Sequence, residues 1–220
     1  MIIIILFLIS MNTIQIELEK QKKNFVNMIA LRSAINAAVQ TRSTKNPVFS
    51  SKKTNKDVLF NDWKKLLIQN AKQYKIRKEQ ADFIQSVKDL QKALQDKHGS
   101  LFYKNEVRIA QCQKSLSVYL KWLWCLGEIS PEPPVCPIDR NVINNCYSLL
   151  DKKKDKDDRS FLVSVNKNGG WGCINSIDDY KRLLDIANKV AQLKEKTVSQ
   201  WELSFFNEYL DSDYEDCVLL

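Results

Sequence analysis

The sequence predicts a mostly α-helical protein, a single globular helical domain with one small β-hairpin near residues 161–174. The chain has only five glycines, which is few for an all-β protein. Long segments are rich in Lys, Leu, Gln, Ala and Glu, the residues that favour helix. The length of 220 residues is enough to bury a substantial core within one domain.

The chain divides into three parts. Residues 1–10, MIIIILFLIS, form an apolar extension that ends before a second methionine, Met11. Its apolar run is about half of the roughly 20 residues needed to cross a membrane, and no basic region or cleavage site flanks it. We therefore expect an upstream extension or a segment packed on the body, rather than a membrane anchor. A helical domain over residues 11–210 and an acidic tail over residues 211–220 follow.

Three helices are expected in the first half of the chain. Apolar side chains recur at helical spacing in residues 14–40, and a basic stretch rich in Ser and Thr then interrupts the pattern. Further helices are expected over residues 57–74 and 79–97. The only histidine, His98, stands at the end of the third, where a cation complements the helix dipole. A single histidine also excludes a Ser-His-Asp triad or a two-histidine metal site within one chain.

The longest apolar helix is expected from about residue 105 to 126. A proline-rich segment follows it, and a helix over residues 139–150 begins with Asp139 as its N-cap. The mixed charges of residues 151–159 indicate a loop. Beyond this loop, the run FLVSV and the Asn-Gly-Gly turn predict the hairpin. Two capping boxes then open helices that extend to about residues 194 and 210: Ser176 with Asp179, and Ser199 with Glu202.

The charge of the chain is unevenly distributed. The net charge is +8, and the last 16 residues, FFNEYLDSDYEDCVLL, hold five acids and no base. The rest of the chain therefore carries about +13, which attracts polyanions, DNA above all. A well-solvated lysine surface is the alternative. Nearby aromatic residues either stack on bases or fill the core. We expect the phosphate contacts at five lysines before and within the second helix: Lys52, Lys53, Lys56, Lys64 and Lys65.

The six cysteines stand at irregular spacings and include no Cys-x-x-Cys pair. Neither a zinc ribbon nor a thioredoxin-like redox site is predicted. We expect reduced thiols, a cytoplasmic location and no cofactor or metal.

Two lysines lie on one line of this longest apolar helix. Nearly every other side of residues 109–126 is apolar, which is typical of a central, buried helix. Lys114 and Lys121 are seven residues apart, so two helical turns bring both onto the one polar stripe. Because an unpaired buried ammonium is costly, the stripe requires water, a carboxylate or an anionic ligand opposite it.

The proline-rich segment can supply that carboxylate. Its four prolines exclude a helix. The roughly 11 residues from 128 to 138 span up to about 36 Å, enough to return along the roughly 20 Å of helix between Lys114 and Gly127. We expect this return to place Asp139 against the lysine stripe, either as a structural ion pair or as a reactive site.

This segment resembles the catalytic segment of the helix-hairpin-helix DNA glycosylase superfamily. The similarity covers about 30 residues: a lysine in an apolar helix, a return loop, and CPIDRNVI, in which the aspartate caps the next helix. The resemblance implies that Lys114 or Lys121 forms a Schiff base with the sugar and that Asp139 assists departure of the base. The family's Leu-Pro-Gly-Val-Gly hairpin has no counterpart, because KNEVRIAQCQ precedes and includes the start of this helix.

Two functions from different classes follow. The first is an intracellular basic protein that binds nucleic acid, acting as a DNA base-excision glycosylase/lyase through one of the two lysines and Asp139. The alternative is a noncatalytic helical interaction module, whose acidic tail and basic body bind protein partners. A membrane-tethered form of either, through residues 2–8, is a third interpretation.

Overall fold

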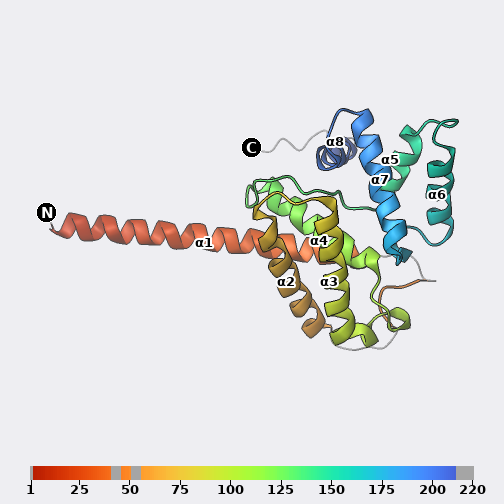
Figure 1. Cartoon of the computed structure of the whole chain (residues 1–220). Helices are drawn as coiled ribbons and strands as arrows, with labels where there is room; N and C mark the ends of the chain where they lie inside the picture. Colours follow the sequence, from red (N-terminus) through yellow and green to blue (C-terminus); the bar gives the residue numbers. More distant parts are fainter. Residues whose placement is uncertain (1, 41–45, 51–55, 212–220) are drawn as a thin grey trace.

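A computed structural model of the chain describes the backbone of residues 2–40, 46–50 and 56–211. It describes side chains from residue 14 to residue 208 within those ranges. This part of the chain folds into α-helices and short 3-10 helices without a β-strand, and its one β-type contact is an isolated bridge between Phe49 and Phe102. The predicted mostly helical fold is confirmed (Figure 1).

The described helices lie in the following order along the chain. The α-helices are α1 (Ile2–Val39), α2 (Asp57–Ala71), α3 (Gln80–His98), α4 (Ile109–Cys125), α5 (Arg140–Leu149), α6 (Lys156–Lys167), α7 (Ile177–Leu193) and α8 (Val198–Asp211). The 3-10 helices are η1 (Lys72–Lys75), η2 (Gly99–Leu101), η3 (Tyr103–Asn105) and η4 (Trp171–Cys173).

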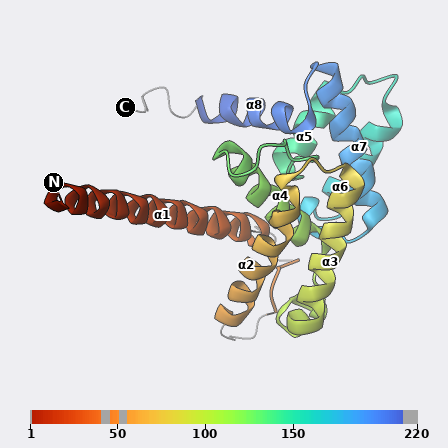
Figure 2. The ribbon, with the colours of Figure 1, turned by 60° about the vertical axis from the view of Figure 1, so that its left-hand side comes forward.

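Helix α4 lies at the centre of the molecule, as its apolar composition predicts. It packs against α1, α2, α3 and η4, and most of its side chains are buried, including Ile109, Cys112, Leu116 and Leu120. Helices α2 and α3 lie on one side of it, whereas α5, α6, α7 and α8 gather on the other (Figures 1 and 2). Helix α4 therefore has structural neighbours on most of its sides, which explains why so little of it is polar.

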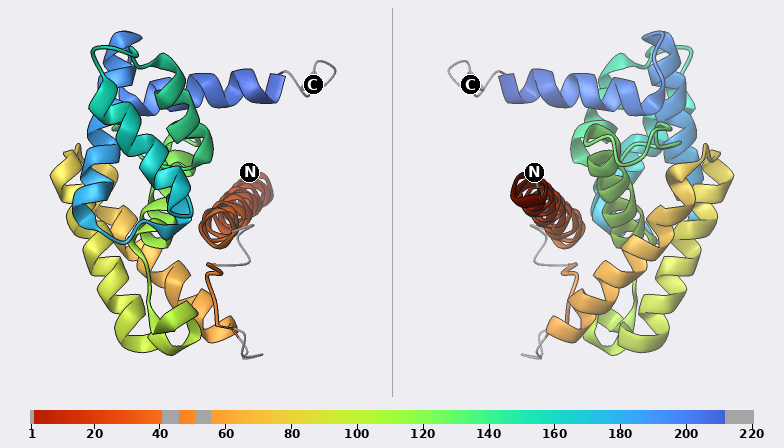
Figure 3. Two further views of the ribbon diagram at one scale, coloured as in Figure 1. Left: turned by 90° about the vertical axis from the view of Figure 1, so that its right-hand side faces the viewer. Right: turned by 90° about the vertical axis from the view of Figure 1, so that its left-hand side faces the viewer.

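Helix α1 has two different halves. In its C-terminal half, Ala30, Ala34 and Ala38 are buried against the body, and these small side chains let α1 and α4 approach closely. Its N-terminal half stands clear of the body (Figures 1 and 2), and Figure 3 views the helix nearly along its axis. No described helix combines the length and apolarity that a membrane crossing requires.

The predicted β-hairpin at residues 161–174 is wrong. This segment contains the second part of α6 and the short helix η4. Leu162 and Val165, three residues apart, are both buried on one helical face, and this spacing outweighs the β-branched composition. The two glycines end the helix instead of turning a hairpin: Gly169 has φ +105°, and the Gly170 amide donates to the Val165 carbonyl at 2.9 Å.

The predicted loop at residues 151–159 is only partly correct, because α6 begins at Lys156. Asp157 and Asp158 occupy its first turn, where negative charge complements the positive end of the helix dipole.

Of the two predicted capping boxes, the second is wrong, and of the first only the Ser176 cap is formed. Ser176 caps α7 as expected, accepting the Asp179 amide at 3.2 Å. Helix α8, however, begins at Val198, and its box is formed by Thr197 and Gln200: the Gln200 amide donates to Thr197 Oγ1 at 3.2 Å, and the Thr197 amide donates to Gln200 Oε1 at 3.4 Å. Glu202 is therefore free for a different contact.

Candidate active site in the cleft between α4, α5 and α8

The proline-rich segment returns along α4 as predicted. Gly127, with φ +70°, lets the chain leave the helix, and Ile129, Val135, Cys136 and Ile138 then anchor the segment in the core. The fully buried amide of Gln113 holds its end. Gln113 Nε2 donates to the Ile138 carbonyl at 2.8 Å, and Gln113 Oε1 accepts the Ile138 amide at 3.2 Å. These two bonds place the next residue, Asp139, beside α4.

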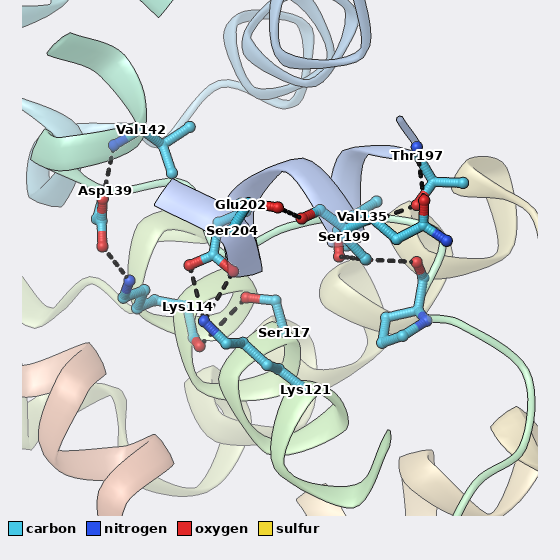
Figure 4. Close-up of polar contacts among 12 residues, drawn as sticks. Lys114, Ser117, Lys121, Val135, Asp139, Val142, Thr197, Ser199, Glu202 and Ser204 are labelled. Atoms are coloured by element: carbon cyan, nitrogen blue, oxygen red, sulfur yellow. Dashed lines mark hydrogen bonds and ion pairs between the residues drawn. The ribbon is translucent and has the colours of Figure 1, made fainter. Parts of the chain in front are cut away.

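Side chains at the start of α8 also hold the proline-rich segment by hydrogen bonds (Figure 4). Ser199 Oγ donates to the Pro133 carbonyl at 2.8 Å, and Thr197 Oγ1 donates to Glu132 Oε2 at 2.7 Å. The proline-rich segment lacks many backbone donors, because proline has no N–H. Side chains from the start of α8 supply hydrogen bonds to it instead. The first turn of α8 is thereby held in the orientation that directs Glu202 toward α4.

Lys114 and Asp139 meet at the wall of a cleft. Lys114 Nζ lies 2.6 Å from Asp139 Oδ2, and the side chains are 9% and 26% exposed. The second carboxylate oxygen, Oδ1, accepts the Val142 amide at 2.9 Å, so Asp139 is also the N-cap of α5. The indole ring of Trp171 lies beside the ammonium, 5.9 Å from Lys114 Nζ to the ring centroid. The expected placement of the aspartate against the lysine stripe is confirmed for Lys114.

Lys121 does not pair with Asp139. Its ammonium contacts both oxygens of Glu202, at 2.9 and 2.7 Å, and lies 4.1 Å from the ring centroid of Phe206. Burial raises the pKa of Glu202 above its ordinary value, although the adjacent Lys121 ammonium opposes that shift. The sequence did not identify Glu202 as the partner of Lys121, because Glu202 also suited a capping box. The signal that could have identified it is its position four residues after Val198, which places it on the inward face of α8.

Both ion pairs open onto one cleft of about 590 Å³, a volume typical of small-ligand sites. Its walls come from α1, α4, α5, η4 and α8. The apolar part of the lining includes Val118, Trp122, Trp171, Leu203 and Phe206, and Arg140 adds a further cation. Ammonium groups beside carboxylates, against aromatic walls, provide an amine nucleophile and a proton acceptor within one hollow.

A larger hollow of about 670 Å³ lies between α1, the end of α2 and the end of α4. Lysines line its rim, and one of them, Lys23, is 2.7 Å from Glu128. Neither Lys114 nor Asp139 lines it. The smaller cleft is the better candidate, because there the charged groups are shielded from water and held in place.

The described lysines among those expected to contact phosphates do not line this cleft. Lys52 and Lys53 lie outside the described residues. Lys56 Nζ lies 4.2 Å from the ring centroid of Phe49, Lys64 lines a small hollow with Arg32, and Lys65 is exposed, 3.7 Å from Asp62.

Two of the aromatic residues nearby, Trp63 and Tyr74, are buried, so they serve the core and are closed to base stacking. The sole histidine, His98, ends α3 as expected, and its Nε2 lies 3.2 Å from Asp62 Oδ2, a contact that the sequence did not predict.

Within the described residues, no three His, Cys, Asp or Glu side chains are grouped as a metal site requires. No family model, curated protein or solved structure matches this chain. Function is therefore inferred from the chemistry of the cleft.

Proposed function

We propose that this protein binds DNA and acts as a base-excision glycosylase/lyase, with Lys114 as the nucleophile and Asp139 as its proton partner. One observation carries the proposal: Lys114 Nζ lies 2.6 Å from Asp139 Oδ2 at the wall of a cleft that is open to a ligand. Lys121 is the weaker candidate, because both carboxylate oxygens of Glu202 already accept hydrogen bonds from its ammonium.

Schiff-base formation at an abasic sugar, the first step of the lyase reaction, balances with these two residues alone. The Lys114 ammonium passes a proton to Asp139, and the neutral amine attacks the aldehyde carbon of a ring-opened abasic sugar. The resulting carbinolamine takes the proton back on its hydroxyl and loses water, which leaves a protonated Schiff base on the lysine. Overall, an ammonium and an aldehyde give an iminium and one water. The short contact between Nζ and Oδ2 provides the path for the proton.

The surroundings of the pair suit a nucleotide. Trp122, Trp171 and Phe206 line the cleft, and aromatic faces accept an extruded base or sugar. The excess of positive charge outside the acidic tail attracts the phosphate backbone without sequence preference.

Borohydride trapping tests the covalent step. Wild-type protein incubated with an oligonucleotide that carries an abasic site or an oxidised base should give a covalent adduct once the Schiff base is reduced. Lys114→Gln, which keeps a donor toward Asp139 but lacks the amine, should abolish the adduct. Lys121→Gln is the matched control and should retain it. An adduct that survives Lys114→Gln, or no adduct with the wild type on any of these substrates, would overturn the assignment.

Asp139→Asn tests the role of the carboxylate. Asn keeps the N-cap but cannot accept the proton, so trapping should be lost while circular dichroism and thermal unfolding show a folded protein. Unchanged trapping by this variant would contradict the proton-transfer role.

Salt-dependent binding tests the wider claim. Affinity for a DNA duplex should fall steeply as salt rises, because each neutralised phosphate releases counterions. Changing Lys52, Lys53, Lys56, Lys64 and Lys65 together to Gln should weaken binding at every salt concentration. If the wild type shows no binding even at low salt, the nucleic-acid proposal fails.

A noncatalytic helical interaction module is the competing proposal. The observation that favours it is that each ammonium of the cleft has its own carboxylate partner, an arrangement that also suits a purely structural role. In that case Lys114→Gln and Lys121→Gln should both lower stability, and neither the wild type nor the variants should form an adduct.

A further inference from the structure

The solvent-facing half of α1 carries an apolar stripe. Ile14, Leu18, Phe25 and Met28 are 43–62% exposed on a helix that projects away from the body (Figures 1 and 2). With Gln21 they follow the alternating spacing of four and three residues that defines the core of a coiled coil. In the sequence, the same spacing continues upstream at Ile4, Phe7 and Met11.

This stripe lies on the opposite side of α1 from the body. The residues of α1 that contact the body include Lys23, which pairs with Glu128, Asn27, which accepts a hydrogen bond from Tyr119, and the buried Ala30 and Ala34. At 100° per residue, the centre of the stripe is about 170° around the helix from the centre of these four positions, and about 140° from it once the buried Leu31, Ile35 and Ala38 are included. A second helix can therefore pack on the stripe without displacing the helices that already hold α1.

The charges beside the stripe indicate which helix would pack there. In a coiled coil, Leu18 and Phe25 would take the first core position of two successive heptads. Glu17 and Lys22 then take the two positions that flank the core, and side chains at these positions form ion pairs between the two helices. In a parallel pair of identical helices, Glu17 of each copy lies opposite Lys22 of the other. In the single chain, Glu17 pairs with Lys20 and Lys22 pairs with Glu19, both within α1 and both exposed. Exposed pairs contribute little stability, so they can be replaced by pairs to a second helix at little cost in free energy.

We propose that α1 forms a parallel two-stranded coiled coil with α1 of a second copy of this chain. The heptad spacing, the placement of the stripe opposite the body and the complementary flanking charges all support the same partner. Gln21, the polar residue of the core, would hold the two helices in register at some cost in affinity. The Lys114–Asp139 cleft of each copy would lie outside this interface, because α1 lines it with Ser33 and Ala37, further along the helix.

Sedimentation velocity of the full chain over a concentration series tests this proposal. The wild type should shift from the mass of one chain to that of two as concentration rises. Replacing both Leu18 and Phe25 with Gln should raise the dissociation constant by more than about tenfold. Ile16→Gln is the control: Ile16 is 63% exposed and Phe25 is 60% exposed, but Ile16 lies off the stripe, so this variant should dimerise like the wild type.

Charge reversal tests the orientation. Glu17→Lys alone and Lys22→Glu alone should each weaken the dimer. The two changes together should restore it, because each new charge then faces the opposite charge on the partner helix. Failure of this rescue would contradict the parallel arrangement.

A protein that stays monomeric at all concentrations would overturn the proposal. Equal sensitivity to Ile16→Gln and Leu18→Gln would also overturn it, since nonspecific apolar association has no preferred face. Binding of the monomer to anionic phospholipid vesicles, lost with Leu18→Gln, would instead identify a lipid surface as the occupant.

Discussion

Asp139→Asn separates the charge of the Lys114–Asp139 pair from the N-cap of α5. Asn caps a helix about as well as Asp, so the bond from the Val142 amide is kept and only the negative charge is lost. At 2.6 Å and an effective dielectric constant of about 20, the two charges attract by roughly 6 kcal/mol before the cost of removing them from water is subtracted.

The net effect is much smaller than that attraction. Exposed pairs contribute about 0.2–1 kcal/mol, whereas breaking a buried pair costs about 3–5 kcal/mol. This pair is intermediate, because Lys114 is nearly buried and Asp139 is a quarter exposed. We expect Asp139→Asn to lower the free energy of unfolding by about 2 kcal/mol. Asp139→Ala should cost about 1 kcal/mol more, since it also removes the N-cap.

Urea unfolding at neutral pH, in a double-mutant cycle with Lys114→Met, measures the interaction directly. The coupling between the two sites should be about 1.5–2 kcal/mol. A coupling below about 0.5 kcal/mol would show that the two ions do not meet in solution, and the reasoning about the return of the proline segment would then fail. The slope of unfolding against urea should stay constant across the four proteins; a change in slope would show that the variants alter more than the pair.

Three further predictions follow from the same region. Gln113→Leu leaves the amide and the carbonyl of Ile138 without partners, so it should cost about 2–4 kcal/mol in urea unfolding, and a loss below about 1 kcal/mol would contradict the two bonds. Gly127→Ala should cost about 1 kcal/mol in thermal unfolding, because an alanine at φ +70° is strained, and Gly127→Asn should cost less. Burial raises the pKa of Glu202 above 4.5, so the folded state holds this proton more tightly than the unfolded state. That stability is present below about pH 4.5 and is lost as pH rises through the raised pKa. The stability of the wild type relative to Glu202→Gln should therefore fall as pH rises through that range, and a rise would refute the assignment.

The sequence alone predicted most of the helices because apolar spacing and N-caps are local signals. Helix α4 was recognised as central from its own composition, and the return of residues 128–138 followed from chain length and proline geometry. The hairpin failed for a physical reason as well. The run FLVSV has β propensity, but as part of α6 it buries Leu162 and Val165 on one face, and tertiary packing overrides a propensity of this size.

The sequence placed Lys114 and Lys121 on one stripe and put a carboxylate, Asp139, within reach of it. Two residues seven apart on a helix are separated by about 10.5 Å along its axis, so helical periodicity alone could not decide which lysine the aspartate would meet. Only the tertiary structure decided it, because the bonds from Gln113 fix where the return ends. The partner of Lys121 depended on a contact 81 residues away in the chain. No local pattern encodes that distance: Glu202 reaches α4 only because α8 docks on the proline segment, and a buried carboxylate must find a cation once it is there.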